Sequence, residues 1–214
     1  MPKRKIVSPN LPDQLAAGDL EVLLDVEDPI IENVLIENCT VSIDSIRNLE
    51  FRQVRFKNVI FMNFIAPNVY LRDVEFDHCQ CINAELTESA LKQVEFRQCR
   101  MNGISFGESF LEDVQFNHSM LDLSSFAYAK QKNVRFSDSQ LKEADFYENT
   151  FKSIQFDQCD LSGTRFSNTS LKGVDLSTSK FEQISVDIDS IRGAIVNREQ
   201  ALGFLQLLGL VVKD

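Results

Sequence analysis

A large apolar residue returns at every fifth position between residues 31 and 191, and the register does not slip. Of the 17 phenylalanines, 14 fall in this one column. A period of five fits neither the 3.6-residue repeat of an α-helix nor the two-residue alternation of a flat strand. A fixed repeat of this kind indicates a solenoid, in which each turn of the chain packs on the turn before it.

The position two residues before each large residue is mostly small or β-branched, as at Val94, Cys99 and Ser109. Residues two apart on an extended segment face the same way, so each five-residue unit sends one small and one large side chain inward. A second period of 20 residues lies on top, because phenylalanine recurs at that spacing from Phe56 to Phe156. Four five-residue sides therefore make one turn, and we expect a square coil with stacked phenylalanines.

The pattern small-x-[Phe/Leu]-x-x resembles the pentapeptide-repeat family, and "CDLSGTRFSNTSLKGVDLS" at residues 159–177 is close to its consensus. The resemblance covers about three quarters of the chain. It implies an all-β fold, a right-handed quadrilateral β-helix, here with a short C-terminal α-helix. We expect an N-terminal cap at residues 1–30, a β-helix of about eight coils at residues 31–193 and a C-terminal helix and tail for dimerisation at residues 194–214.

Both ends of the chain narrow the resemblance. Residues 195–212 are similar to the C-terminal helix and tail of the Qnr quinolone-resistance proteins, and residues 8–15 and 47–56 look most like chromosomal Gram-positive members of that group. What the resemblance implies is a homodimer that binds DNA gyrase and topoisomerase IV as a mimic of duplex DNA and protects them from fluoroquinolones. The repeat is unbroken, so the two loops of many plasmid-borne Qnr proteins are missing. That departure weakens the expectation of strong protection.

The composition separates classes of partner. The formal net charge is −10, whereas direct nucleic-acid binding requires a basic surface. The charge fits a basic protein partner, and it also fits solubility alone. No apolar run is long enough to span a bilayer, and "MPKRKIV" at the start lacks the apolar stretch of a signal peptide. We therefore expect a cytoplasmic protein that binds neither nucleic acid nor membrane.

Catalytic and metal-binding patterns are missing from the sequence. All five cysteines fall on inward columns of the repeat, typical of small buried side chains in a reducing cytoplasm. His78 beside Cys79 and Cys81 suggests a metal site, but the register points His78 outward and both thiols inward. There is no phosphate-binding loop and no nucleophile elbow. We expect no cofactor and no enzyme activity.

The known register sorts the outward residues by side of the square. One side, which we call the acidic side, is our candidate partner-binding surface, and a solvated face without a partner remains the alternative. Its outward residues are Glu85, Glu88, Glu108, Tyr128, Asp145, Tyr147 and Glu148. Another side, the basic side, carries a ladder of Arg and Lys residues from Arg52 to Arg192. A third side carries Ile60, Met62, Ile82 and Met120, which would be the contact if the protein were a scaffold for an unrelated partner. An accessory domain of an enzyme is the remaining alternative.

The period breaks after residue 193. Asn197 and Gln200 form a capping-box pattern, Gly209 is a helix stop, and residues 210–212 read as a strand. So much apolar surface favours an interface between two copies, although a cap folded on its own last coil remains possible. The expected interface residues are Leu202, Phe204, Leu205, Leu207, Leu208, Leu210, Val211 and Val212.

Three local irregularities are also expected. A short helix is possible around residues 19–24, and the first coils have poor repeats. Gln131 is the one polar residue in the large-residue column of the strong block. Three explanations stay open for it: a bulge at residues 128–133, a hydrogen bond inside the coil, or a distortion that serves a partner.

Overall fold

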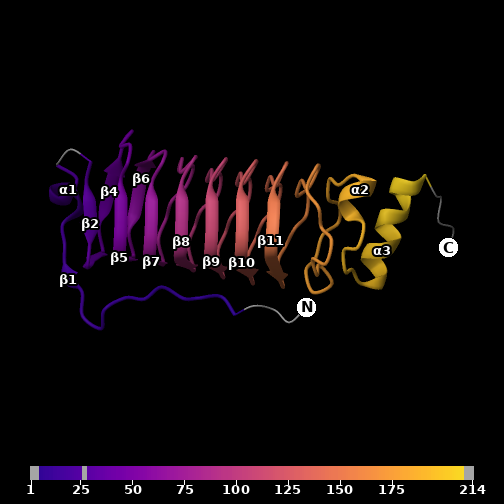
Figure 1. The fold of residues 1–214 in the computed structure, drawn as a ribbon, viewed down its shortest axis with the longest axis horizontal. Coiled ribbons are helices and arrows are strands. Elements are labelled where there is room, and N and C mark those ends of the chain that lie inside the picture. The colour runs from indigo at the N-terminus through magenta and orange to yellow at the C-terminus, as the bar shows by residue number, and fades with distance from the viewer. Residues whose placement is uncertain (1–4, 26–27, 210–214) are drawn as a thin grey trace.

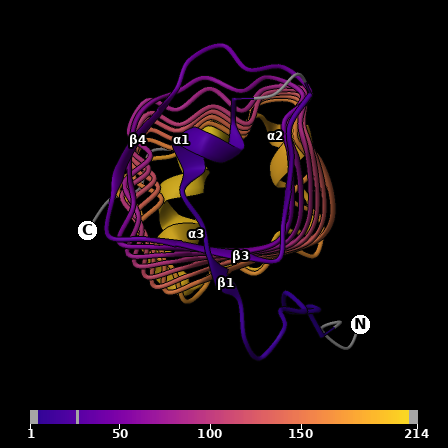
Figure 2. The same ribbon diagram turned by 90° about the vertical axis from the view of Figure 1, so that its left-hand side faces the viewer.

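The computed structural model describes residues 5–25 and 28–209 and shows a long rod. The chain winds as a square coil (Figure 2). Seen from the N-terminal end it turns clockwise as it recedes, so the coil is right-handed, as expected.

Most strands belong to one parallel nine-stranded sheet. Its members are β1 (Ala16–Ala17), β2 (Ile30–Glu32), β3 (Val34–Glu37), β5 (Glu50–Lys57), β7 (Tyr70–Asp77), β8 (Ala90–Arg97), β9 (Phe110–Asn117), β10 (Lys130–Ser137) and β11 (Thr150–Asp157). Paired residues are 20 apart, as in Val94↔Val114, except between β1 and β3, where they are 18 apart. β4 (Thr40–Ile43) and β6 (Ile60–Phe64) form a second sheet, whose register shifts between Val41 and Ile43. The expected irregularity of the first coils is confirmed.

A left-handed residue turns each corner. Each eight-residue strand covers two sides of the square and bends at a residue with positive φ, such as Asp113 at 55°. On the other two sides the corner is a four-residue turn, as where Ile104 N–H donates to the Met101 carbonyl (3.1 Å) around Gly103 at φ 72°. From residue 48 to residue 173 this backbone conformation recurs every five residues and so sets the period that the sequence displays.

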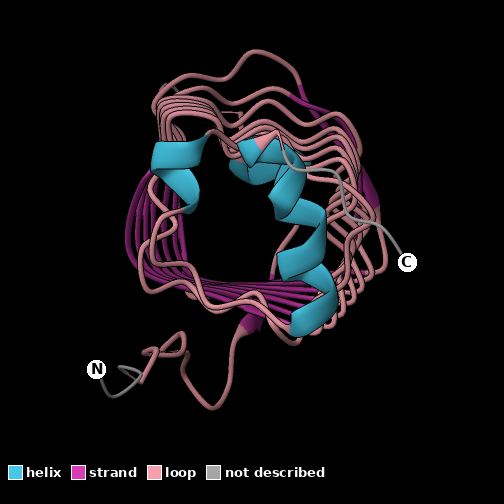
Figure 3. Cartoon of the chain, turned by 90° about the vertical axis from the view of Figure 1, so that its right-hand side faces the viewer, coloured by secondary structure: helices cyan, strands magenta, loops and turns pink. Residues whose placement is uncertain are grey.

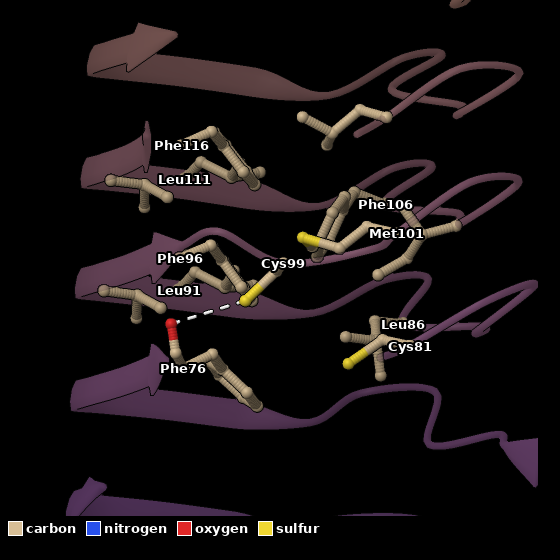
Figure 4. Packing of buried hydrophobic residues seen from close by; sticks show 14 of the residues in the cluster. Phe76, Cys81, Leu86, Leu91, Phe96, Cys99, Met101, Phe106, Leu111 and Phe116 are labelled. Carbon is tan, nitrogen blue, oxygen red and sulfur yellow. Dashed lines mark hydrogen bonds between the residues drawn. The ribbon is translucent and has the colours of Figure 1, made fainter. Parts of the chain in front are cut away.

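Apolar side chains fill the interior. Ring centroids in the stack from Phe56 to Phe156 are 4.7–5.3 Å apart, which confirms the expected stacking. Figure 4 shows these layers, with Leu91 beside Phe96 and the Cys99 thiol donating to the Phe76 carbonyl (3.4 Å).

Gln131 keeps its place in a regular strand, so a bulge at residues 128–133 is wrong. Its side chain is buried and its Nε2 donates to Asn149 Oδ1 at 2.8 Å. The Asn149 amide in turn donates to the Phe126 carbonyl. Gln131 and Asn149 thus form a hydrogen-bonded polar pair inside the coil, with Gln131 in the column where other coils place large apolar side chains.

Two segments at the N-terminal end pack against the rod in different ways. β1 pairs with β3, and α1 (Leu20–Leu23), capped by Asp19, places Leu20 in the core, which confirms the expected short helix. Residues 5–15 instead run along the outside of the rod, beside β5 to β10 (Figure 1).

The C-terminal end is closed by α2 (Ile188–Ile191), α3 (Arg198–Phe204) and the 3₁₀ helix η1 (Leu205–Leu208) (Figure 3). The Asn197–Gln200 capping box is confirmed, and Gln200 Nε2 donates to the carbonyls of Leu176 and Ser179 (3.0 and 2.8 Å). Gly209 has φ 68°, as a helix stop requires.

Candidate protein-interaction surface

The acidic side is built from turns stacked in register. Bridges join Glu85, Ser105, Ser125, Asp145 and Arg165 along the rod. Because each turn sits on the one before it, outward side chains recur at the coil spacing of roughly 4.8 Å. Those carried on left-handed corner residues, such as Glu88, Glu108 and Glu148, are exposed. The side is therefore a rigid, straight display of side chains.

Its N-terminal half carries unneutralised carboxylates. Glu85, Glu88 and Glu108 are exposed, and the structure gives none of them an ion pair within its described ranges. They belong to two successive coils. Their full charge is available to a partner.

Its C-terminal half has a different character. Arg165 makes a two-point contact with Asp145 (2.8 and 2.5 Å) and lies 4.8 Å from the centroid of the Tyr147 ring. The contact with Asp145 raises the pKa of Arg165, and the positive charge of Arg165 compensates the negative charge of Asp145. Tyr128 packs edge-on against Tyr147 at 5.5 Å.

The remaining neighbour, Glu148, holds the tyrosine hydroxyl. A hydrogen bond with Glu148 raises the pKa of Tyr147, whose oxygen also accepts from Asn168 Nδ2 at 3.1 Å. The seven expected surface residues thus lie on one side, but as a carboxylate cluster and a tyrosine–arginine cluster. The arginine pairing was missed in the sequence, although Asp145 and Arg165 are 20 residues apart and so lie on adjacent coils.

On the adjacent side, charges are internally paired. Arg55 Nε donates to Glu75 (2.8 Å) and Arg97 Nε to Glu95 (2.7 Å), and both carboxylates are largely buried. On the basic side, Lys132 pairs with Glu112. These paired carboxylates differ from Glu85, Glu88 and Glu108 on the acidic side, which stay open to solvent.

The third side exposes scattered apolar residues. Ile60, Met62 and Ile82 are 39%, 57% and 48% exposed and belong to adjacent coils, whereas Met120 is half-buried. Leu123, another apolar residue expected to face outward on this side, is 62% exposed.

The expected dimer residues are only partly open. Leu202 and Leu207 are exposed, while Phe204 and Leu205 are half-buried, with Phe204 packed on Phe181 at 5.7 Å. A hollow of about 510 Å³ lies between α3 and residues 179–184. The side chain of Leu208 and the residues Leu210, Val211 and Val212 lie outside what the structure describes.

The metal ligands suggested by the sequence are not brought together in the described residues. Among the described residues no group of three or more His, Cys, Asp or Glu side chains is placed to hold a metal ion. His78 is exposed and contacts Asp77 (2.7 Å), while Cys79 and Cys81 are buried. Within the same ranges, none of the helices has the length and apolarity needed to cross a bilayer.

Comparison with known proteins agrees with this architecture. The family described as "Pentapeptide repeat region" matches residues 49–126, and "Pentapeptide repeats (8 copies)" matches residues 150–183. No curated protein matches the chain.

Several solved structures are similar. A trypsin-treated variant of QnrB1, a plasmid-mediated fluoroquinolone resistance protein, is 19% identical, with 86% of this chain and 99% of that chain covered and a TM-score of 0.43. Rfr23 from the cyanobacterium Cyanothece 51142 is 11% identical, with 55% and 91% covered and a TM-score of 0.35. HetL from Nostoc sp. strain PCC 7120, involved in heterocyst differentiation regulation, is 13% identical, with 77% and 88% covered and a TM-score of 0.28.

Proposed function

The chain belongs to the pentapeptide-repeat family, and from that premise we propose that it is a non-catalytic mimic of duplex DNA that binds DNA gyrase and topoisomerase IV in the cytoplasm. The observation that carries the proposal is the cluster of unpaired carboxylates, Glu85, Glu88 and Glu108, on one side of a straight rod. Protection of these enzymes from fluoroquinolones is the wider role that follows from the resemblance of the chain ends to Qnr proteins.

The charge spacing supports this reading. Duplex DNA carries one phosphate charge per roughly 1.7 Å of its axis. The acidic side offers one or two carboxylates per coil of roughly 4.8 Å. This density is lower than that of DNA, but its sign and straight axis suit a basic groove that grips a duplex. The tyrosine–arginine cluster beside it offers the residue types that dominate binding energy in protein interfaces.

Direct binding to purified gyrase tests the proposal. The variant E85Q/E88Q/E108Q should bind at least about tenfold more weakly than the natural chain, because it loses three unneutralised charges. The matched control E32Q/E143Q/E182Q changes the net charge equally at exposed positions on other sides and should bind within about twofold of it. Equal affinity for both triple variants would show that the acidic side is not the contact.

We also propose a homodimer joined through the C-terminal ends. Leu202 and Leu207 lie exposed on α3 and η1, where an apolar side chain does not stabilise a monomer because it is not buried. L202D/L207D should sediment as a monomer under conditions where the natural chain is a dimer. A natural chain that is already monomeric at high concentration would contradict this interface.

One alternative has its own observation. Ile60, Met62 and Ile82 form an exposed apolar group on adjacent coils, which suits a scaffold with an unrelated partner. M62D/I82D should leave gyrase binding intact if the acidic side is the contact. Loss of gyrase binding in this variant, with E85Q/E88Q/E108Q unaffected, would make the apolar group the contact surface instead of the acidic side.

A further inference from the structure

The N-terminal segment, residues 5–10, lies along the corner between the basic side and the adjacent side. The corner is formed by one residue from each of five successive strands: Gln53, Asp73, Gln93, Asp113 and Asn133. We call this column the corner groove. Elsewhere on the rod, corner residues are mostly exposed, but Asp73 and Asn133 are only 7% and 2% exposed.

In the described part of the segment, residues 5–10, four hydrogen bonds hold it, and each involves its backbone. Val7 N–H donates to Asp113 Oδ1 (3.2 Å) and Asn10 N–H donates to Asp73 Oδ1 (2.8 Å). Gln53 Nε2 donates to the Asn10 carbonyl (2.9 Å), and Asn133 Nδ2 donates to the Lys5 carbonyl (3.3 Å). The corner groove therefore binds the backbone of an extended peptide, with its side chains acting as hydrogen-bond acceptors and donors.

The spacing explains the fit. From Asn133 to Gln53 the groove spans four coil spacings, roughly 19 Å. The stretch from residue 5 to residue 10 reaches roughly 17 Å when extended. Pro9 restricts the backbone around it to extended conformations, so little freedom is lost on docking.

One side chain of the segment adds an apolar anchor, because Ile6 is only 9% exposed. Asp73 and Asp113 contribute the two carboxylate acceptors, and Asp73 also contacts Arg72 (3.5 Å). The fitting ligand is thus an extended peptide with a buried β-branched apolar residue and free N–H groups at the two following contact positions.

We propose that the corner groove is a peptide-binding site and that the N-terminal segment is its exchangeable ligand, which a second copy of the chain can supply in trans. Occupation in cis leaves the groove closed to other molecules. Release of the segment opens it, and an exchanged segment links two rods side by side.

The test uses full-length chains and a labelled peptide of residues 1–15. I6D removes the apolar anchor and should free the groove, which loss of amide-exchange protection at Val7 and Asn10 will report. The peptide should then bind I6D saturably, and at least tenfold more weakly to the natural chain, whose groove is filled.

Variants of the groove test which corner residues hold the peptide. I6D/D73G/D113G removes both acceptors, and glycine suits the positive φ of 55° at each position. It should bind the peptide at least tenfold more weakly than I6D. I6D/Q93G makes the same kind of change at a corner residue to which the structure assigns no bond with the segment, and it should match I6D within twofold.

Three results would overturn the proposal. The first is no saturable binding to I6D once exchange shows that the segment is released. The second is equal binding to I6D and I6D/D73G/D113G. The third is continued protection of Val7 and Asn10 in I6D, which would mean that Ile6 does not anchor an exchangeable ligand.

Discussion

The left-handed corner residue sets the period of this fold. Every fifth backbone position needs φ near +55°, which favours Asn, Asp and Gly. Many corners carry one of these residue types, such as Asn83 (φ 53°) and Gly103 (φ 72°). Leu123 (φ 62°) and Tyr128 (φ 61°) adopt the same backbone conformation without being favoured types. The apolar column is easier to see in the sequence because long residues at the corners dilute the Asn and Asp signal.

Leu123→Asn should stabilise the protein. Leu123 is exposed, so the change gives up almost no burial, while asparagine adopts this backbone conformation more readily. We expect a gain of about 1 kcal/mol, seen as a rise of about 2–4 °C in the melting temperature. The reciprocal control, Asn83→Leu at an equivalent corner, should lower it. A fall on Leu123→Asn would mean that Leu123 makes a contact worth more than the strain.

Buried thiols should stay unreactive in the folded state. Burial raises the pKa of Cys81 well above its ordinary value and that of Cys159 to about 12. At pH 8 a thiol reagent should label the half-buried Cys39 first, and Cys39→Ser should remove that fast phase. Rapid labelling of all five thiols would contradict the packing of the interior.

The same shifts predict a loss of stability at alkaline pH. The folded state holds the Cys159 thiol neutral, so its contribution to stability is complete below the ordinary thiol pKa of 9.0 and is lost as the pH rises toward about 12. The denaturant midpoint should therefore fall above pH 9, and replacing Cys159 by serine should reduce the slope of that fall.

At the scale of elements, the backbone hydrogen bonding between successive coils is interrupted after β11, and we call this interruption the seam. Strands cover two sides of every coil through β11, but residues 171–174 form a turn around Gly173 at φ 78°. In the described part of the chain, no backbone hydrogen bond joins Phe151 or Ser153 to residues 170–173. A hollow of about 380 Å³ opens there, lined in part by Phe151 and Lys172.

Amide exchange should locate this seam. Phe151 and Ser153 lie at an unpaired edge, whereas Gln131 and Asn133, one coil earlier, lie in a strand paired on both sides. We expect at least about tenfold faster exchange at Phe151 and Ser153 than at their counterparts. Equal protection would show that the seam is closed in solution.

Much of the architecture followed from periodicity alone. The column of phenylalanines predicted the square coil and the stacked rings, and Asn197 with Gln200 predicted the start of α3. The seam has a signal in the sequence, because Gly173 stands where earlier coils have a polar corner residue such as Asn133 or Ser153. Whether this glycine interrupts the hydrogen bonding depends on how the turn around it fits against β11.

The site was predictable only in part. The side on which each surface residue lies follows from its position modulo 20. The pairing of Asp145 with Arg165 and the docking of residues 5–10 do not, because they depend on side-chain rotamers and on backbone bonds between distant segments. Ile6 and Val7 belong to no repeat, so no periodic argument reaches them.

At the scale of the whole molecule, the rod separates its charges by side. Ion pairs neutralise the side that carries Glu75 and Glu95, while Glu85, Glu88 and Glu108 stay open on the acidic side. A stiff coil keeps these carboxylates at fixed spacings, so a basic partner meets an ordered array and loses little entropy in binding it.

The most direct test is a DNA gyrase supercoiling assay with and without a fluoroquinolone, titrated with this protein. Our account predicts that the natural chain restores supercoiling in the presence of the drug at up to equimolar protein, and that E85Q/E88Q/E108Q does not. Inhibition without rescue would identify a DNA mimic that competes but does not protect. If micromolar protein leaves both gyrase and topoisomerase IV unaffected, with drug and without it, the DNA-mimic account is wrong.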